Sequence, residues 1–65
     1  MTFKKVVKIL RQDGWVFVRS KGSHFHFKKE GVKKIATVVY HAGKDVSIGV
    51  LKNLEKGTGL SLKSR

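Results

Sequence analysis

A chain of 65 residues that contains no cysteine has to fold around a hydrophobic core alone. A domain of this size buries only about 60% of the surface that its unfolded form exposes. Without cysteine, neither a disulfide nor a thiolate-bound metal can supplement that burial. We therefore expect a single domain over residues 1–65.

Two segments have the apolar spacing of amphipathic helices. The first follows Thr2, a residue type that caps helices, and should end at Gly14, because glycine readily adopts the left-handed conformation. The second follows Ser47 and should end at Gly57. The apolar positions that share a face are Phe3, Val6, Val7 and Leu10 in the first helix and Val50, Leu51 and Leu54 in the second.

Three strands are predicted between these helices. Residues Trp15 to Ser20 are aromatic and β-branched, which indicates a strand partly buried on both sides. A turn at Lys21 to Ser23 leads into a second strand, His24 to Lys29, and a turn at Glu30 to Val32 leads into a third, about Lys34 to His41.

The second strand alternates strictly, so that one of its faces belongs to the core. Phe25 and Phe27 point one way, while His24, His26 and Lys28 point the other. Together the elements predict an α+β fold of order α-β-β-β-α, in which a three-stranded antiparallel sheet carries two helices on one face.

The charge of the chain points to an anionic partner. Fifteen Lys and Arg residues oppose four acidic residues, giving a formal net charge of +11, and nucleic acid is the leading candidate to offset it. A solvated basic surface, anionic lipid or an acidic protein would satisfy the same charge. No apolar stretch approaches the roughly 20 residues that cross a bilayer. We therefore expect a soluble, cytoplasmic protein without membrane contact.

Histidine is the residue type whose ordinary pKa, about 6.5, lets it accept and release protons at neutral pH. Metal-free RNA cleavage needs a base at the ribose 2′-hydroxyl and an acid at the departing 5′-oxygen. His24 suits the base role because it follows the turn of Lys21, Gly22 and Ser23, where glycine allows close backbone approach and the polar side chains could hold a phosphate. The alternative is an exposed strand residue without a role.

The acid stays open between His41, His26 and a lysine. A two-residue turn at Gly31 and Val32 would set position 24 opposite position 39 and place His41 on the face of His24, whereas a three-residue turn would point His41 into the core face. His41 could equally be a structural histidine at a strand end. Because the acidic residues are scattered, His24 and His26 are not expected to form a metal site, and no cofactor is expected.

Several basic and polar residues near His24 are candidates for phosphate contacts. Aromatic stacking on bases is less expected, because Phe3, Phe25 and Phe27 occupy core-patterned positions and Trp15 and Tyr40 are ambiguous. The candidates for RNA or phosphate binding are Arg19, Lys21, Gly22, Ser23 and Lys28.

Three stretches of the chain together resemble the HicA toxin family. They are Gly14 to Arg19, Lys21 to His24, and Val38 to Gly43 with its His41-Ala42-Gly43. The length and the order of elements agree as well, and the resemblance runs from about Thr2 to Ser61. Its most specific part is Gly22-Ser23-His24 directly after a strand and a basic residue.

The resemblance implies a fold like that of double-stranded RNA-binding domains and the role of toxin in a type II toxin–antitoxin system. The implied activity is that of an mRNA interferase, a metal-independent endoribonuclease, whose catalytic histidine corresponds to His24. The implied partners are mRNA and a HicB-type antitoxin, with which a free monomer would form a hetero-oligomer. Two features depart from the family pattern: Phe25-His26 stands where a second histidine often follows the first directly, and Ser47 to Gly49 lacks the usual proline and Gly-Thr pair.

Two other functions fit the same residues. The chain could be a non-catalytic RNA-binding module of double-stranded RNA-binding fold, in which the lysines matter and His24 does not. It could also be a basic protein whose function is association with an acidic partner, of which an antitoxin is one example.

Overall fold

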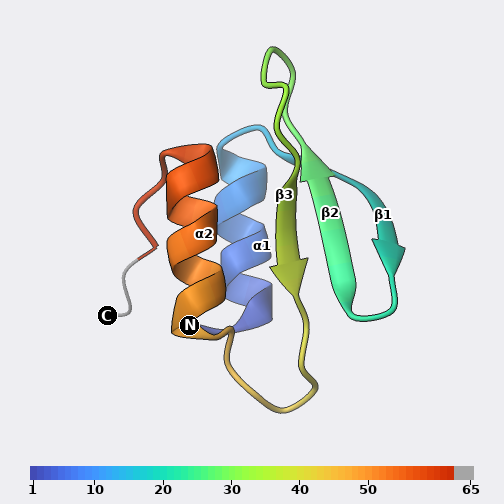
Figure 1. Ribbon diagram of the computed structural model, residues 1–65, viewed down its shortest axis with the longest axis vertical. Coiled ribbons are helices and arrows are strands. Elements are labelled where there is room, and N and C mark those ends of the chain that lie inside the picture. The colour runs from blue at the N-terminus through green and yellow to red at the C-terminus, as the bar shows by residue number, and fades with distance from the viewer. Residues whose placement is uncertain (63–65) are drawn as a thin grey trace.

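The computed structural model describes residues 1–62; the last three residues of the expected domain, 63–65, lie outside the described residues. Its elements follow the predicted order α-β-β-β-α. Figure 1 shows both helices on one side of β3 and the hairpin of β1 and β2 on the other. The elements are α1 (Phe3–Gln12), β1 (Val16–Lys21), β2 (His24–Lys28), β3 (Ala36–Val39) and α2 (Ile48–Thr58).

The three strands form one antiparallel sheet in the order β1-β2-β3, and both helices lie against β3. One face of the sheet therefore belongs to the core, which confirms the predicted α+β class. The sheet supplies Phe27, Ala36 and Val38 to this core. The helices and connections supply Val6, Leu10, Trp15, Val46, Leu51, Leu54 and Leu62.

The prediction that the first strand is partly buried on both sides is wrong. Every residue of β1 is exposed, and only Trp15, which precedes the strand, is buried. The reason is the position of β1 at the edge of the sheet, since both helices lie against β3 at the opposite edge. Aromatic and β-branched residues favour strands, but they do not reveal which strand the helices cover.

A bulge interrupts the pairing of β1 with β2. Phe17 is opposite Phe27 and Arg19 is opposite His26, so that Val18 has no partner of its own. Side chains of directly paired residues lie on the same face of a sheet. The bulge therefore places Phe17 on the core face and Arg19 on the opposite one, although a regular strand would put both on one face.

The predicted helix starts are confirmed, and the end of the second helix needs correction. The hydroxyl oxygens of Thr2 and Ser47 accept hydrogen bonds from the amides of Lys5 and Val50. α2 continues through Gly57 to Thr58 and ends at Gly59, which has a φ of 76°. The Gly59 amide donates to the Glu55 carbonyl oxygen at 2.8 Å, which closes the last turn beyond Gly57.

The predicted turns are present, but their limits shift. Lys21 belongs to β1, so the first turn consists of Gly22 and Ser23 alone; Gly22 has a φ of 59°, as type II′ turns require at their first position. β3 is shorter than the predicted Lys34 to His41. The chain between β2 and β3 turns at residues 29–32, where the Val32 amide donates to the Lys29 carbonyl oxygen, and bends again at Lys34 before β3.

Within residues 1–62, neither helix is long and apolar enough to span a membrane.

The end of α2 can be tested with two alanine substitutions that should change the free energy of unfolding in opposite directions. Gly57→Ala should raise the free energy of unfolding by up to about 1 kcal/mol, because alanine favours a helix more than glycine does and a Cβ at this position meets open space. Gly59→Ala should lower it by about 1 kcal/mol, because an L-residue is strained at a φ of 76°. Urea unfolding followed by circular dichroism measures both. If both substitutions changed the free energy of unfolding in the same direction, the observed helix end would be contradicted.

Candidate functional site

The two strand histidines occupy neighbouring rows on the face of the sheet opposite the core. His24 is paired with Lys21 of β1 and with Val39 of β3. His26 is paired with Arg19 and Thr37 in the next row. Because paired side chains share a face, each histidine has a cation on one side and a β3 residue on the other.

The cations of this face keep their charge available. Arg19, Lys21 and Lys28 are exposed, and Lys28 follows His26 on the same face of β2. In the described part of the chain, the ion pairs involve Lys29 with Asp13 and the N-terminal amine with Asp45. None of the three cations of the histidine face is therefore neutralised by a carboxylate among residues 1–62.

His26 is held in place by β3, whereas His24 is exposed. The Nδ1 of His26 shares a hydrogen bond of 2.8 Å with the Thr37 hydroxyl oxygen, and both side chains are half-buried. This contact fixes the imidazole ring and leaves its other nitrogen, Nε2, for another partner. Thr37 was not among the residues singled out in the sequence; alternation and the 24-to-39 register together would have placed it beside His26.

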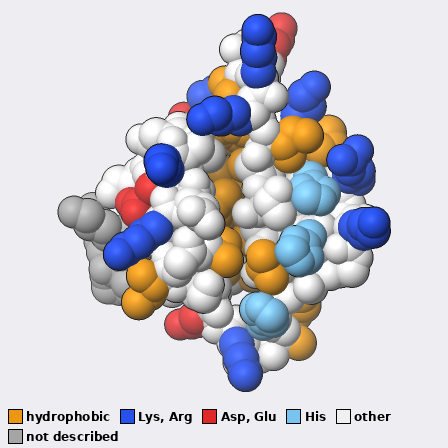
Figure 2. Space-filling view, viewed as in Figure 1, with side chains coloured by type: hydrophobic (Ala, Val, Ile, Leu, Met, Phe, Trp, Pro, Cys, Tyr) orange, Lys and Arg blue, Asp and Glu red, His pale blue; other side chains and the backbone are white. Residues whose placement is uncertain are grey.

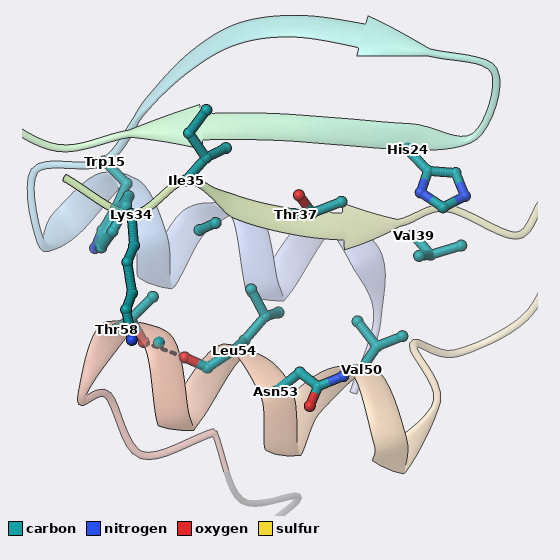
Figure 3. Close-up of a pocket in the computed structure, with 12 residues that line it drawn as sticks. Trp15, His24, Lys34, Ile35, Thr37, Val39, Val50, Asn53, Leu54 and Thr58 are labelled. Atoms are coloured by element: carbon teal, nitrogen blue, oxygen red, sulfur yellow. Dashed lines mark hydrogen bonds between the residues drawn. The ribbon is translucent and has the colours of Figure 1, made fainter. Parts of the chain in front are cut away.

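A groove separates the histidine face from α2. Figure 2 shows a hollow with apolar atoms at its base, with histidine side chains along one wall and Lys and Arg side chains around the rim. His24 lies at the end of the groove near Val39, and Lys34 and Trp15 lie at the other end (Figure 3). From α2, Val50 and Leu54 project toward β3, and the Asn53 amide lies along the helix beside Val50. The packing of both helices on one face of the sheet was predicted, but the periodicity of α2 does not reveal which of its residues border β3.

His41 lies in a different environment. The observed register places His24 opposite Val39, as a two-residue turn at Gly31 and Val32 would, although the connection from β2 to β3 is longer, and β3 ends at Val39. His41 is exposed in the following loop and lines a separate hollow with Thr2, Lys4 and Lys44 at the start of α1. The structure thus brings His26 into the row next to His24 and leaves His41 in the loop after β3; of these histidines, His24 lines the groove.

The turn before His24 is open to a ligand. Gly22 and Ser23 are exposed, and a Cβ on Gly22 would meet no atom within 4 Å. The carbonyl oxygen of Ser23 accepts a hydrogen bond from the Tyr40 amide at 2.7 Å, which ties the turn to the end of β3. Ser23 and Lys21 are therefore next to His24, one along the chain and the other across the hairpin, on a backbone that this bond ties to β3.

The aromatic residues belong mainly to the opposite face. Phe27 and Trp15 are buried, and the Trp15 indole donates to Asp13 Oδ2 at 3.2 Å. Phe25 is half-buried and contacts Phe3 edge-on, with ring centroids 5.0 Å apart. No three His, Asp or Glu side chains among residues 1–62 come together as a potential metal site.

Comparison with known proteins gives the family. The family model described as the HicA toxin of bacterial toxin–antitoxin systems matches residues 3–60, which is nearly the whole chain. A search of curated proteins found no match. The matched range contains all five elements and both histidine rows. The chain belongs to the HicA toxin family.

Proposed function

We propose that this chain is the toxin of a type II toxin–antitoxin system and acts as an mRNA interferase, a metal-independent endoribonuclease centred on His24. The observation that carries this proposal is the position of His24, exposed between the Lys21 ammonium and an open groove on the uncovered face of the sheet. Family membership supports the toxin role. An mRNA substrate places the activity in the cytoplasm.

In the proposed reaction, His24 removes the proton of a ribose 2′-hydroxyl. The resulting alkoxide attacks the adjacent phosphorus, the bond to the 5′-oxygen breaks, and a cyclic 2′,3′-phosphate remains on one product. Lys21, with Arg19 and Lys28 further along the face, stabilises the negative charge that builds up on the phosphate oxygens. The Ser23 hydroxyl and the open backbone at Gly22 complete the phosphate site.

His26 is the better candidate for the acid that protonates the departing 5′-oxygen. It lies on the same face as His24, one row along the sheet, and Thr37 fixes its ring. His41, the other candidate, lines a hollow outside the groove. A second histidine two residues after the first would then replace the directly adjacent histidine that is frequent in the family.

The proposed protein partner is a HicB-type antitoxin, which would bind the free monomer and silence it in a hetero-oligomer. The unneutralised cations of the histidine face and the net charge of +11 favour an acidic partner. Charge of opposite sign would also speed the capture of the toxin.

The first test is cleavage of a labelled single-stranded RNA in EDTA. The wild-type protein should cut the RNA, and His24→Ala should reduce the rate by about 10²- to 10⁴-fold, the usual contribution of a general base. Because His24 is exposed, the variant should keep the wild-type circular dichroism spectrum and melting temperature. Equal cleavage by both proteins would remove His24 from the mechanism. Binding without cleavage by the wild type would indicate a non-catalytic RNA-binding module.

The assignment of the acid can be tested by comparing two histidines. His26→Ala should slow cleavage at least tenfold, whereas His41→Ala should change the rate less than twofold. Thr37→Val should retain the shape of the side chain but lose the 2.8 Å hydrogen bond, and should lower kcat while leaving KM nearly unchanged. Initial rates over a range of RNA concentrations measure all three variants. A larger loss in His41→Ala than in His26→Ala would reverse the assignment.

Phosphate contacts are testable through salt dependence. Each contact to single-stranded RNA contributes about 0.7 to the slope of log K against log salt concentration. Lys21→Ala and Arg19→Ala should each lower this slope by about that amount. Lys52→Ala, which removes an exposed lysine of α2 that does not line the groove, serves as the matched control and should leave the slope unchanged. Equal effects of all three variants would assign RNA binding to diffuse charge.

A further inference from the structure

The groove beside His24 has the size and lining of a small-ligand site. Its volume is about 290 Å³, just below the range of about 300 to 1,000 Å³ that is usual for such sites. Its walls are apolar at Ile35, Val39 and Val50, and Ile35 is 46% exposed although it is a large hydrophobic residue. Such walls suit a flat ring more than an ion.

Polar groups occur at only a few points of the groove. Asn53 is exposed on α2 and lines the groove beside Val50, where its amide offers both a donor and an acceptor (Figure 3). Thr37 of β3 also lines the groove, but its hydroxyl oxygen is engaged with His26 on the β2 side. Apolar walls with an amide on one side match a nucleobase, which has two apolar faces and an edge of donors and acceptors.

The position of the groove relative to the phosphate site is the second argument. Lys21 and Val39 flank His24 on opposite sides, and Val39 belongs to the groove. A phosphate held between Lys21 and His24 would therefore have its neighbouring nucleotide on the groove side. An unpaired base can turn away from its strand and enter such a cleft, whereas a base within a duplex cannot.

We propose that the groove between β3 and α2 binds one unpaired base of the RNA next to the scissile phosphate, with Asn53 contacting its edge. The proposal rests on the proposed ribonuclease function, and it makes single-stranded RNA the substrate class. A fold like that of double-stranded RNA-binding domains thus serves a single strand. The cations around the groove hold the backbone, and the groove holds the base.

Gly57 offers a sharp test because it lines the groove without a side chain. A Cβ at Gly57 meets no atom within 4 Å, so Gly57→Leu should fill the groove without displacing the fold. Gly49→Leu is the matched control, since Gly49 is also a helical glycine of α2 with open space around it but does not line the groove. Asn53→Ala removes the amide and keeps the groove open.

The variants are made in the full His24→Ala chain, so that the RNA remains intact during binding. The probes are a ten-nucleotide single-stranded RNA and the blunt duplex of the same strand. Gly57→Leu should weaken binding of the single strand at least tenfold and Asn53→Ala about fivefold, which is the size of one lost hydrogen bond. Binding of the duplex should change less than twofold, and Gly49→Leu should change neither. Trp15, the one tryptophan of the chain, lines the groove, so its fluorescence should respond to the single strand alone.

The outcomes separate this proposal from the ribonuclease itself. Circular dichroism and melting temperature first establish that each variant is folded, and Asn53→Ala provides a second measurement if Gly57→Leu is not. Cleavage by the wild type with unchanged single-strand binding in both groove variants would overturn the base site and leave the groove for a protein partner. Selective loss of single-strand binding in a protein that never cleaves RNA would contradict the proposed ribonuclease and support the base site.

Discussion

One unpaired residue in β1 determines which side chains reach the histidines. Phe17 is needed on the core face, where it contacts the ring of Phe27 with centroids 5.8 Å apart, while Arg19 lies beside His26 on the other face. The two residues are two positions apart, so a regular strand would send both to one face. The bulge at Val18 resolves this conflict. Without the bulge, Arg19 and Lys21, the two cations paired with the histidines, would lie on the core face instead.

The rest of the site follows from how the core is divided. Both helices lie against β3 and bury one face of the sheet, so the other face needs no apolar cover. Histidines, cations and Thr37 can therefore occupy that face without weakening the core. A domain of this size buries little apolar surface, so its stability is marginal. Concentrating the core on one side leaves the other free for chemistry, and the groove forms where α2 meets the edge of β3.

Features that depend on neighbouring residues were predicted correctly more often than features that depend on how the elements are arranged. The caps Thr2 and Ser47 and the alternation around Phe27 depend on neighbouring residues, and they were predicted correctly. The burial of β1 was predicted incorrectly because it depends on the order of the strands and on which edge the helices cover. The end of α2 at Gly59 was missed because Gly57 has the same local preference, and only the continued helix distinguishes them.

The candidate site was predictable in part for the same reason. Lys21, Gly22, Ser23 and His24 are neighbours in the chain, so the family motif identified them together. The row that joins His26 to Arg19 and Thr37 needed the register of both hairpins and the bulge. Asn53 and Gly57 reach the site through the packing of α2, which no spacing within that helix reveals.

The lysine and arginine side chains of this surface differ in whether a carboxylate neutralises them, and this difference affects how anionic partners would bind. Lys29 is occupied by Asp13, which also accepts from the Trp15 indole, so this cation holds the end of α1 to the sheet. Arg19, Lys21 and Lys28 have no such carboxylate within residues 1–62 and repel one another across the histidine face. An anion bound there removes that repulsion, so a second anion gains nothing from it. RNA and an acidic antitoxin that use these cations would therefore weaken each other's binding to the same degree, as thermodynamic linkage requires.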